Sequence, residues 1–253
     1  MTSFRNRFAR RDVLIGTFIK TPTTHATEIL GTLGFDFVVI DEEHAPFDRA
    51  QTDVLLFAAR ASNLAGLVRV PSAAPEGLLS VLDCGATGVL VPHVKSAEMA
   101  RQIVAACRYR GGSRGFSASS RAGRYGGLSM WDHVEAADAG VAVIAMIEDP
   151  EAVEHIETIL TVEGLDGIFI GRGDLTVACN APTRDAPRIQ EAITRIMAAA
   201  AKSSKPVCIL ADGLTEAKAF AALGATAFIV ASDQGFMKKA AHAAVTEFAT
   251  LRK

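Results

Sequence analysis

Several polar residues stand directly behind apolar runs that are typical of buried strands, and their types suit metal and carboxylate chemistry. They are Asp41 and His44, Arg69, Glu148, Gly171 to Asp174, Asp212 and Asp233. In parallel α/β folds the carboxyl ends of the strands meet at one face, where substrates bind. Carboxylates, a histidine and an arginine gathered at that face indicate a divalent metal and a carboxylate substrate.

Glu148 gives the sharpest indication of a metal ligand. It follows the apolar run 141–147 with no turn residue between, in register with Ile144 and Met146. A carboxylate that ends a buried strand needs a partner, and a divalent cation is a good one. A salt bridge or a helix cap is the ordinary alternative, although the neighbouring Asp149 suits the cap better.

The loop GRGDL, behind the run IFI, offers a second carboxylate in Asp174. Gly171 and Gly173 let the backbone approach a ligand closely and turn N–H groups toward a carboxylate or phosphate. The loop is not a dinucleotide fingerprint, because Thr176 stands where a third glycine is needed. Asp174 alone is a weak signal, but with Glu148 on the preceding strand it predicts an oxygen-ligated Mg²⁺ or Mn²⁺.

His44 and Arg69 are candidates for proton transfer and anion binding. A histidine at a strand-end rim suits a general base because its unperturbed pKa is about 6.5. Asp41 and Asp83 are candidates to orient its ring, a solvated loop histidine is the alternative, and His93 is a weaker candidate base. Arg69 interrupts the buried run LVRVP and needs an anion, either an internal carboxylate or a bound substrate.

A repeated pattern predicts the strands that position these residues. Segments 33–41, 84–92, 163–171 and 223–231 share a glycine at a helix end, a short turn and an apolar core. A glycine there can adopt the left-handed conformation that ends a helix, and short runs rich in Val and Ile suit strands buried on both faces. Four further segments fit as strands, at 13–19, 67–71, 141–148 and 206–211.

Helical patterns fill the intervals between the strands. Behind Pro187, apolar residues recur on one helical face from Ile189 to Ala200. Eight strands alternating with helices predict an α/β fold, a (β/α)8 TIM barrel in which residues 1–253 form a single domain. A doubly wound open sheet is the competitor. The remaining histidines fall in helical stretches and are expected at the surface: His25, His133, His155 and His242.

Composition excludes several classes of protein. Apolar residues make up 49% of the chain and charged residues 21%, which excludes a disordered chain. The net charge of −2 gives no general attraction for nucleic acid or anionic membranes, and no apolar run approaches the ~18 residues of a membrane helix. Without CxxC spacing or a signal peptide, we expect a cytoplasmic protein with buried thiols, namely Cys84, Cys107, Cys179 and Cys208.

Segment 108–127 is the exception, with five arginines and six glycines. An RNA-binding tract is disfavoured by the near-neutral chain around it. As a loop over the top of the barrel, the segment would offer guanidinium groups to an anionic small molecule. A structural loop with surface arginines is the alternative.

Seven segments, taken in order, resemble the HpcH/HpaI aldolase/citrate lyase family. They are GFDFVVIDEEHAPFD, VRVP, GATGVLVPHVKSAEMA, RGFSASSRAGRYG, MIEDPEAV, VEGLDGIFIGRGDL and ASDQGFMKKAA. The likeness runs from about residue 13 to 245 and is nearest to the class II pyruvate aldolases, such as those acting on 2-keto-3-deoxy-glucarate and 2,4-dihydroxyhept-2-ene-1,7-dioate.

The resemblance implies a barrel whose last helix is swapped between partners, in a homodimer or a homohexamer. It implies a divalent metal, Mg²⁺, Mn²⁺ or Co²⁺, held by Glu148 and Asp174, and no organic cofactor. Backbone N–H groups of Gly173 and Asp174 would hold the pyruvate carboxylate.

The resemblance also assigns the reacting groups. It makes His44 the base and places Arg69 on the pyruvate oxygens. The aspartates matching Asp41 and Asp83 would position water, metal or the histidine.

Two residues depart from the family pattern. Met146 stands where a glutamine is usual, which removes a polar group near the metal. Arg172 replaces the proline of the usual loop beside the carboxylate site, and is a candidate substrate contact. Both leave the metal ligands intact, and both leave the acceptor substrate open.

The expected activity is that of a carbon–carbon lyase acting on small molecules, with no nucleic acid or membrane partner. It cleaves a 2-keto-4-hydroxy acid reversibly to pyruvate, or a related 2-oxo acid, and an aldehyde. Three alternatives stay open: a citrate-synthase-like condensation of an enolate with an oxo acid, a Schiff-base aldolase using Lys20 or Lys95, and a non-catalytic binding barrel.

Overall fold

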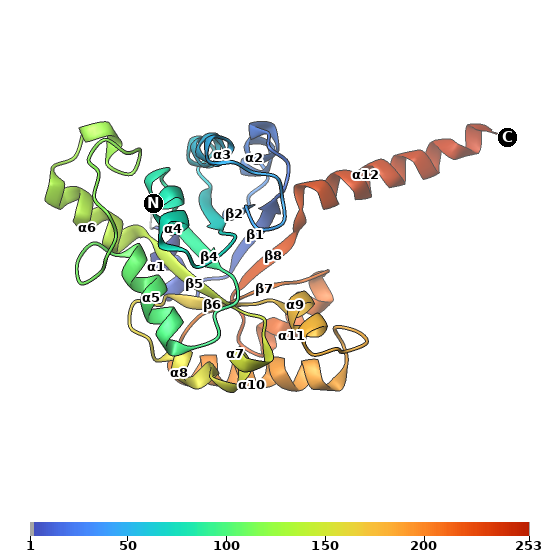
Figure 1. Cartoon of the computed structure of the whole chain (residues 1–253). Coiled ribbons are helices and arrows are strands. Elements are labelled where there is room, and N and C mark those ends of the chain that lie inside the picture. Colours follow the sequence, from blue (N-terminus) through green and yellow to red (C-terminus); the bar gives the residue numbers. More distant parts are fainter. Residues whose placement is uncertain (1–2, 253) are drawn as a thin grey trace.

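Eight parallel strands close into a barrel in the computed structural model, which describes residues 3–252 (Figure 1). Each strand pairs with the next in sequence, and β8 pairs with β1. The strands are β1 (Leu14–Ile19), β2 (Phe37–Asp41), β3 (Ala65–Arg69), β4 (Gly88–Val91), β5 (Ala142–Ile147), β6 (Gly167–Ile170), β7 (Val207–Leu210) and β8 (Ala227–Ser232). The predicted (β/α)8 barrel is confirmed, and the closed sheet excludes the doubly wound alternative.

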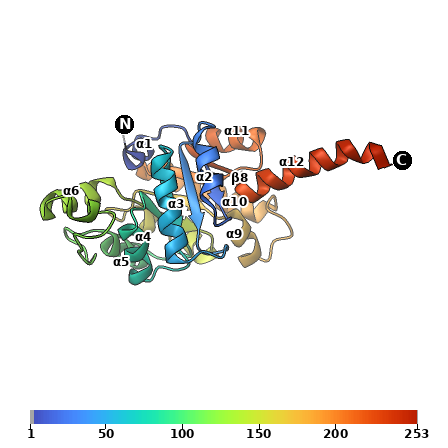
Figure 2. The same cartoon turned by 90° about the horizontal axis from the view of Figure 1, so that it is seen from above.

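Most of the helices lie around the outside of the barrel (Figure 2). They are α1 (Phe4–Ala9), α2 (Thr24–Gly31), α3 (Arg49–Ala61), α4 (Pro75–Asp83), α5 (Ala97–Cys107), α6 (Met130–Gly140), α7 (Pro150–Glu154), α8 (Ile156–Leu160), α9 (Arg172–Ala178), α10 (Pro187–Ser203), α11 (Leu214–Ala222) and α12 (Asp233–Phe248). Short 3-10 turns lie at Arg124–Gly126 and Ala249–Arg252. The α10 helix follows the predicted apolar face, with Ile189, Ile193 and Ile196 buried.

Strand residues alternate between the inside of the barrel and the layer of helices. On β5, Ile144 and Met146 belong to the inner apolar cluster, while Val143 and Ala145 belong to the cluster beneath the helices. Both clusters are fully buried, as continuous apolar strands require. The alternation carries Glu148, in step with Ile144 and Met146, toward the inside of the barrel.

The helix α1 closes one end of the inner cluster. Ser3 caps it, and its Phe4 and Phe8 rings stack on each other with centroids 5.6 Å apart. Phe8 is fully buried beside β6, where a Cβ at Gly167 would lie 2.6 Å from its ring. This packing seals the amino-terminal end and leaves the opposite end of the barrel for a ligand.

The last helix, α12, leaves the barrel and projects from it on the side opposite α6 (Figures 1 and 2). None of its residues is buried, and large apolar side chains are exposed along it: Met237, Val245 and Phe248. Only its first turns contact the barrel, where Phe236 packs against Phe35 with ring centroids 6.1 Å apart. The swap of this helix between partners stays a prediction.

Segment 108–127 does not lie over the top of the barrel, so that interpretation was wrong. The segment connects α5 to α6 and precedes β5, and a chain leaving a helix returns to the amino-terminal ends of the strands. Its arginines are held by carboxylates of the barrel layer: Arg114 by Asp83 and Arg121 by Asp53. It is a structural loop, as the alternative interpretation proposed, but not one whose arginines all lie on the surface, because Arg108 and Arg114 are buried.

His133 also departs from the prediction, because it is buried and not on the surface. It lies on α6 with 2% of its area exposed, against the rings of Tyr109 and Phe116. Segment 108–127 carries both aromatic rings and covers this face of the helix, which helical periodicity alone does not reveal. The other three helical histidines are exposed, as predicted: His25, His155 and His242.

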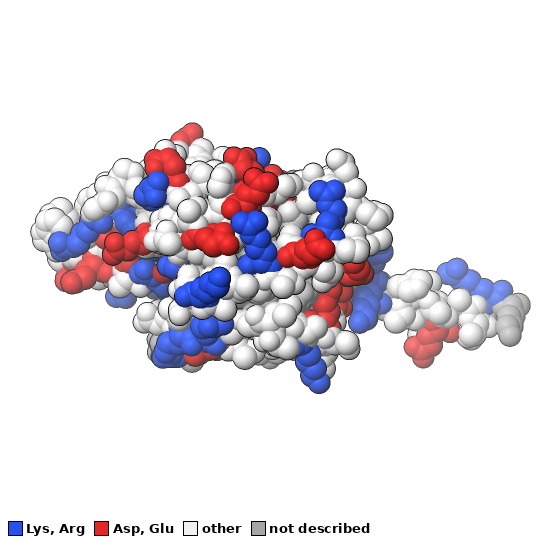
Figure 3. Space-filling view, turned by 90° about the horizontal axis from the view of Figure 1, so that it is seen from below, with Lys and Arg blue, Asp and Glu red and all other residues white. Residues whose placement is uncertain are grey.

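The four cysteines are buried and free, as predicted. Across residues 3–252, no helix combines the length and apolar character needed to cross a membrane. Acidic and basic side chains are interspersed over the face shown in Figure 3, with no large area of one sign on it.

Candidate active site

A cavity of about 380 Å³ lies at the carboxyl ends of the strands. Apolar side chains from the inside of the barrel line part of it: Phe18, Met146 and Phe169. Charged residues line the rest: Lys20, Arg69, Arg172, Asp174, Arg184 and Asp212. An apolar surface with charged groups around it suits a small anionic ligand.

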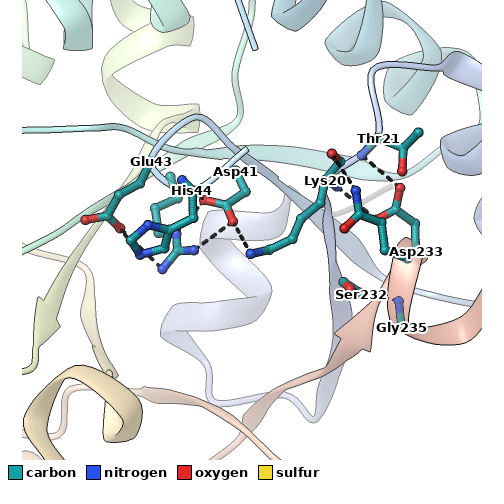
Figure 4. Close-up of polar contacts among 10 residues, drawn as sticks. Lys20, Thr21, Asp41, Glu43, His44, Ser232, Asp233 and Gly235 are labelled. Atoms are coloured by element: carbon teal, nitrogen blue, oxygen red, sulfur yellow. Dashed lines mark hydrogen bonds and ion pairs between the residues drawn. The ribbon is translucent and has the colours of Figure 1, made fainter. Parts of the chain in front are cut away.

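Asp41, the last residue of β2, connects several groups at this end of the barrel (Figure 4). Its side chain is fully buried, and the strand register places it beside Arg69 on β3. Arg69 donates from Nε to Oδ1 at 2.8 Å and from Nη2 to Oδ2 at 2.7 Å. The Nζ atom of Lys20 lies 2.9 Å from Oδ2. The internal carboxylate that the sequence offered as one partner for Arg69 is therefore Asp41.

The charge of Asp41 is stabilised by these contacts. Burial alone would raise the pKa of this carboxyl group, but the hydrogen bonds and positive charges of Arg69 and Lys20 outweigh it. The pKa of Asp41 therefore lies below its ordinary value. An ionised Asp41 in turn fixes the plane of the Arg69 guanidinium group.

His44 lies beside this pair, but Asp41 does not hold its ring. The backbone N–H of His44 donates to Asp41 Oδ1 at 3.2 Å, which shapes the turn after β2. The half-exposed ring instead places Nε2 3.7 Å from Glu43 Oε2. Glu43 also lies 3.3 Å from Arg69 Nη1, so it joins the histidine to the arginine. Glu43 was not among the candidate residues predicted from the sequence, although Glu43 directly precedes His44.

Asp83 lies apart from His44. It is the last residue of α4, and its Oδ1 accepts a hydrogen bond from Arg114 at 3.3 Å. Within residues 3–252, no hydrogen bond or ion pair joins Asp83 to His44. Among the described residues, no contact supports the orienting role that the sequence suggested for Asp83.

Glu148 follows β5 and is 1% exposed. Its Oε1 accepts the backbone N–H of His93 at 2.7 Å, whereas its buried Oε2 has no hydrogen-bond partner among the described residues. Burial raises the pKa of Glu148 to about 7, and the negative charges of Asp174 and Glu43 act in the same direction. A buried carboxylate oxygen without a partner is a place for a cation.

Gly171 packs directly against Glu148. A Cβ atom at this position would lie 2.5 Å from Glu148 Oε2 and 2.7 Å from its Cβ. The φ angle of Gly171 is −83°, so close packing and not backbone conformation requires glycine here. Gly171 is also one of the residues that line the cavity, so the Glu148 carboxylate lies next to the cavity wall.

Asp174 lies in the first turn of α9 and lines the same cavity. Gly171, which packs against Glu148, lines this cavity as well, and the charge of Asp174 contributes to raising the pKa of Glu148. In the described part of the chain, no group of three or more His, Cys, Asp or Glu side chains is arranged to hold a metal ion. Two carboxylates and one unpartnered oxygen nevertheless fit an open site whose other ligands are water and substrate oxygens.

Arg172 lines the cavity, but its guanidinium group is held by residues of β7 and α11. Its Nη1 lies 2.7 Å from Glu216 Oε1, its Nη2 donates to the carbonyl of Leu210 at 3.2 Å, and the group stacks over Phe220. The guanidinium therefore ties α9 to α11. Its predicted contact with substrate stays a prediction.

The two lysines considered for Schiff-base chemistry are both ion-paired. Lys20 reaches Asp41, as described, and Lys95 lies 3.2 Å from Asp149 Oδ1. The backbone at Lys20 is held as well, because Asp233 Oδ1 accepts its N–H at 2.9 Å and Oδ2 accepts that of Thr21 at 3.0 Å (Figure 4). Because a carboxylate engages each amino group, neither lysine presents a free amine to a substrate carbonyl group in this arrangement.

The chain is similar in sequence to a family of aldolases and lyases and to individual members of it. A family model described as HpcH/HpaI aldolase/citrate lyase matches residues 14–241. Over 239 residues the chain is 36% identical to a 5-keto-4-deoxy-D-glucarate aldolase of Klebsiella pneumoniae. The match covers 94% of this chain and 93% of that protein. A second such aldolase, from Shigella dysenteriae, is also 36% identical over the same length.

Among solved structures, the chain is similar to the citrate synthase SbnG, with a TM-score of 0.89 and 30% identity over 98% of both chains. It is also similar to an HpcH/HpaI aldolase/citrate lyase family protein from Burkholderia cenocepacia J2315. That match has a TM-score of 0.92 and 28% identity, over 97% of this chain and 98% of the other.

Proposed function

This chain belongs to the HpcH/HpaI aldolase/citrate lyase family, and from that premise we propose that it is a metal-dependent class II aldolase. It cleaves a 2-keto-4-hydroxy acid reversibly into pyruvate, or a related 2-oxo acid, and an aldehyde. The observation that carries the proposal is the buried, unpartnered Oε2 of Glu148, which packs against Gly171 of the cavity that Arg69 and Asp174 also line.

Glu148 and Asp174 are the residues that would hold Mg²⁺, Mn²⁺ or Co²⁺, and no organic cofactor is needed. A divalent ion held there would act as a Lewis acid toward the keto group of the substrate. The backbone N–H groups of Gly173 and Asp174 hold the carboxylate of the 2-oxo acid in the first turn of α9. A Cβ at Gly173 would meet nothing within 4 Å, so this backbone is open to a ligand.

Two side chains act during cleavage, His44 as the proton acceptor and Arg69 as the positive charge beside the enolate. His44 accepts the proton of the C4 hydroxyl group as the C3–C4 bond breaks, and the electron pair of that bond passes into the enolate. Arg69, whose guanidinium Asp41 holds in one plane, offsets the negative charge on the enolate oxygen. Transfer of this proton from His44 to C3, directly or through water, then gives the 2-oxo acid and returns His44 to its starting form. Phe18, Met146 and Phe169 limit water at this end of the cavity.

The proposal is tested by offering the purified enzyme, with Mg²⁺ or Mn²⁺, pyruvate and a panel of aldehydes, and measuring product mass. We expect an adduct with the mass of pyruvate plus one aldehyde, formed only when enzyme, metal and both substrates are present. Absence of any adduct across the panel, together with no cleavage of such adducts, would contradict the proposal and favour a non-catalytic binding barrel.

A second candidate is condensation of the enolate with an oxo acid. The similarity to the citrate synthase SbnG and the apolar Met146 at the cavity favour it. The same assay decides between the two when oxo acids join the panel. A product formed with an oxo acid at a higher kcat/KM than with every aldehyde would establish condensation as the main activity.

We also propose that the chain assembles as a homodimer or homohexamer in the cytoplasm. The projecting α12 has no buried residue, and an apolar groove runs between it and α2, lined by Ile29, Leu33, Phe35 and Met237. A partner's α12 would cover such a surface. The four buried free cysteines support a reducing compartment.

A further inference from the structure

Arg184 places a weakly held positive charge at the cavity. It lies in the connection between α9 and α10 and lines the cavity together with Gly173 and Asp174. Its Nη2 lies 2.7 Å from Asp212 Oδ2, and the two side chains are 43% and 57% exposed. Ion pairs as exposed as this one contribute little to stability, so the guanidinium can exchange its partner at small cost.

The other cationic side chains that line the cavity are committed to the fold. Arg69 makes two hydrogen bonds to the fully buried Asp41, and Lys20 pairs with the same carboxylate. Arg172 is 5% exposed and is tied to Glu216 and to a backbone carbonyl. Moving Arg69 or Arg172 would take a buried guanidinium group away from its partners, which is costly. Lys20 is less buried, but it shares the Asp41 carboxylate with Arg69.

Asp212 is fixed independently of Arg184. Its backbone N–H donates to Glu216 Oε2 at 2.7 Å, and Glu216 is itself paired with the buried Arg172. The backbone that carries the Asp212 carboxylate is therefore anchored when Arg184 moves. The Asp212 carboxylate therefore has a fixed place beside Arg184 at the cavity.

We propose that Arg184 determines specificity by binding a carboxylate on the aldehyde portion of the substrate, in exchange for Asp212. The inference rests on the proposed function, in which Gly173 and Asp174 hold the carboxylate at the other end of the same molecule. The apolar side chains Phe18 and Met146 line the cavity and suit the carbon chain. The enzyme would therefore select semialdehydes that carry a terminal carboxylate over uncharged aldehydes of equal length.

The test compares succinic semialdehyde with butanal as acceptors for pyruvate, using the metal-loaded full-length enzyme. We expect Arg184→Gln to lower kcat/KM for succinic semialdehyde about tenfold to a hundredfold, the range for one charge-assisted hydrogen bond, through a raised KM. The value for butanal should stay within about twofold. Arg188→Gln, which alters an exposed arginine of α10 that does not line the cavity, is the matched control and should change neither value.

A third variant tests the exchange itself. Asp212→Asn removes the competing charge and should raise kcat/KM for succinic semialdehyde a few-fold. The value of kcat/KM for butanal should stay the same. A fall with succinic semialdehyde, or no change, would show that Asp212 does not compete with the substrate.

Deuterium exchange of the pyruvate methyl group in D₂O reports enolate formation without any aldehyde. If exchange is normal but Arg184→Gln leaves the preference between the two aldehydes unchanged, the role of Arg184 is wrong and the proposed function stands. If the parent enzyme shows neither exchange nor adducts, the proposed function fails.

Discussion

Asp41 and Arg69 face each other across adjacent strands and share two hydrogen bonds, of 2.8 and 2.7 Å, inside the barrel. The pairing holds the planar guanidinium group in one orientation before any substrate arrives. A preorganised donor of this kind stabilises developing charge without reorganising during the reaction. The Asp41–Arg69 ion pair is therefore expected to contribute both to the stability of the fold and to the rate of the reaction, and both contributions can be measured.

Arg69→Lys should lower kcat about 10²–10³-fold, the usual cost of removing one charge-stabilising donor. An ammonium group is a point charge and cannot replace the two-pronged contact of the guanidinium with Asp41 and substrate. Steady-state kinetics with pyruvate and the best aldehyde measure the effect, and circular dichroism checks that the variant is folded. A lysine variant within threefold of the parent would refute the role of Arg69.

Asp41→Asn should destabilise the protein at neutral pH by about 3–5 kcal/mol, the usual cost of breaking a buried ion pair. The pKa of Asp41 lies below that of the unfolded chain, so its charge stabilises the fold above the unfolded pKa of about 3.9. This stabilisation is lost as the pH falls through the lower, folded pKa. Urea unfolding measures the free energy of unfolding of the parent and of the variant. The difference between these two free energies should narrow below about pH 4, and a difference independent of pH would contradict the ionised state assigned to Asp41.

Gly171→Ala should displace Glu148, because the new Cβ would lie 2.5 Å from its Oε2. We expect loss of metal binding and a melting temperature lower by several degrees, since overpacking costs about 1–3 kcal/mol. Gly173→Ala, two residues further on, meets no atom within 4 Å and serves as the folding control. Equal melting temperatures and equal Mn²⁺ affinities for the two variants would show that the contact with Glu148 is unimportant.

Metal removal distinguishes class II from Schiff-base chemistry. EDTA should abolish cleavage, and added Mn²⁺, Mg²⁺ or Co²⁺ should restore it. Glu148→Ala and Asp174→Ala should stay folded but fail to exchange the pyruvate methyl protons in D₂O. Borohydride with pyruvate should leave the protein mass unchanged. If borohydride instead adds one pyruvyl unit and EDTA has no effect, the class II assignment is wrong, and Lys20 and Lys95 become the residues to test.

Assembly can be measured directly by light scattering. The exposed Phe248 and Val245 of α12 should be covered by a second copy, so we expect a dimer or hexamer at micromolar concentration. Val245→Asp and Phe248→Asp together should shift the distribution toward monomer, whereas a pair of substitutions at exposed polar positions, Thr246→Ser and Glu247→Gln, should not. A parent protein that is only monomeric would contradict the swapped-helix prediction.

The barrel and much of the site follow from local sequence. Short apolar runs after a helix-ending glycine predict strands because burial on both faces requires continuous apolar side chains. Strand periodicity then predicts that Glu148, in step with Ile144 and Met146, points into the barrel. These features depend on residues close together in the chain, and the structure confirms the strands.

Only the closed barrel decided which side chains meet. Asp41 and Arg69 are 28 residues apart, and nothing local in either segment specifies that they pair. The same is true of Arg184 and Asp212 at the cavity, and of the ring of His133 beneath Tyr109. Periodicity encodes which face of an element is apolar, but contacts between distant elements depend on strand register and on the path of the loops. Those are set only when the sheet closes and the helices pack around it.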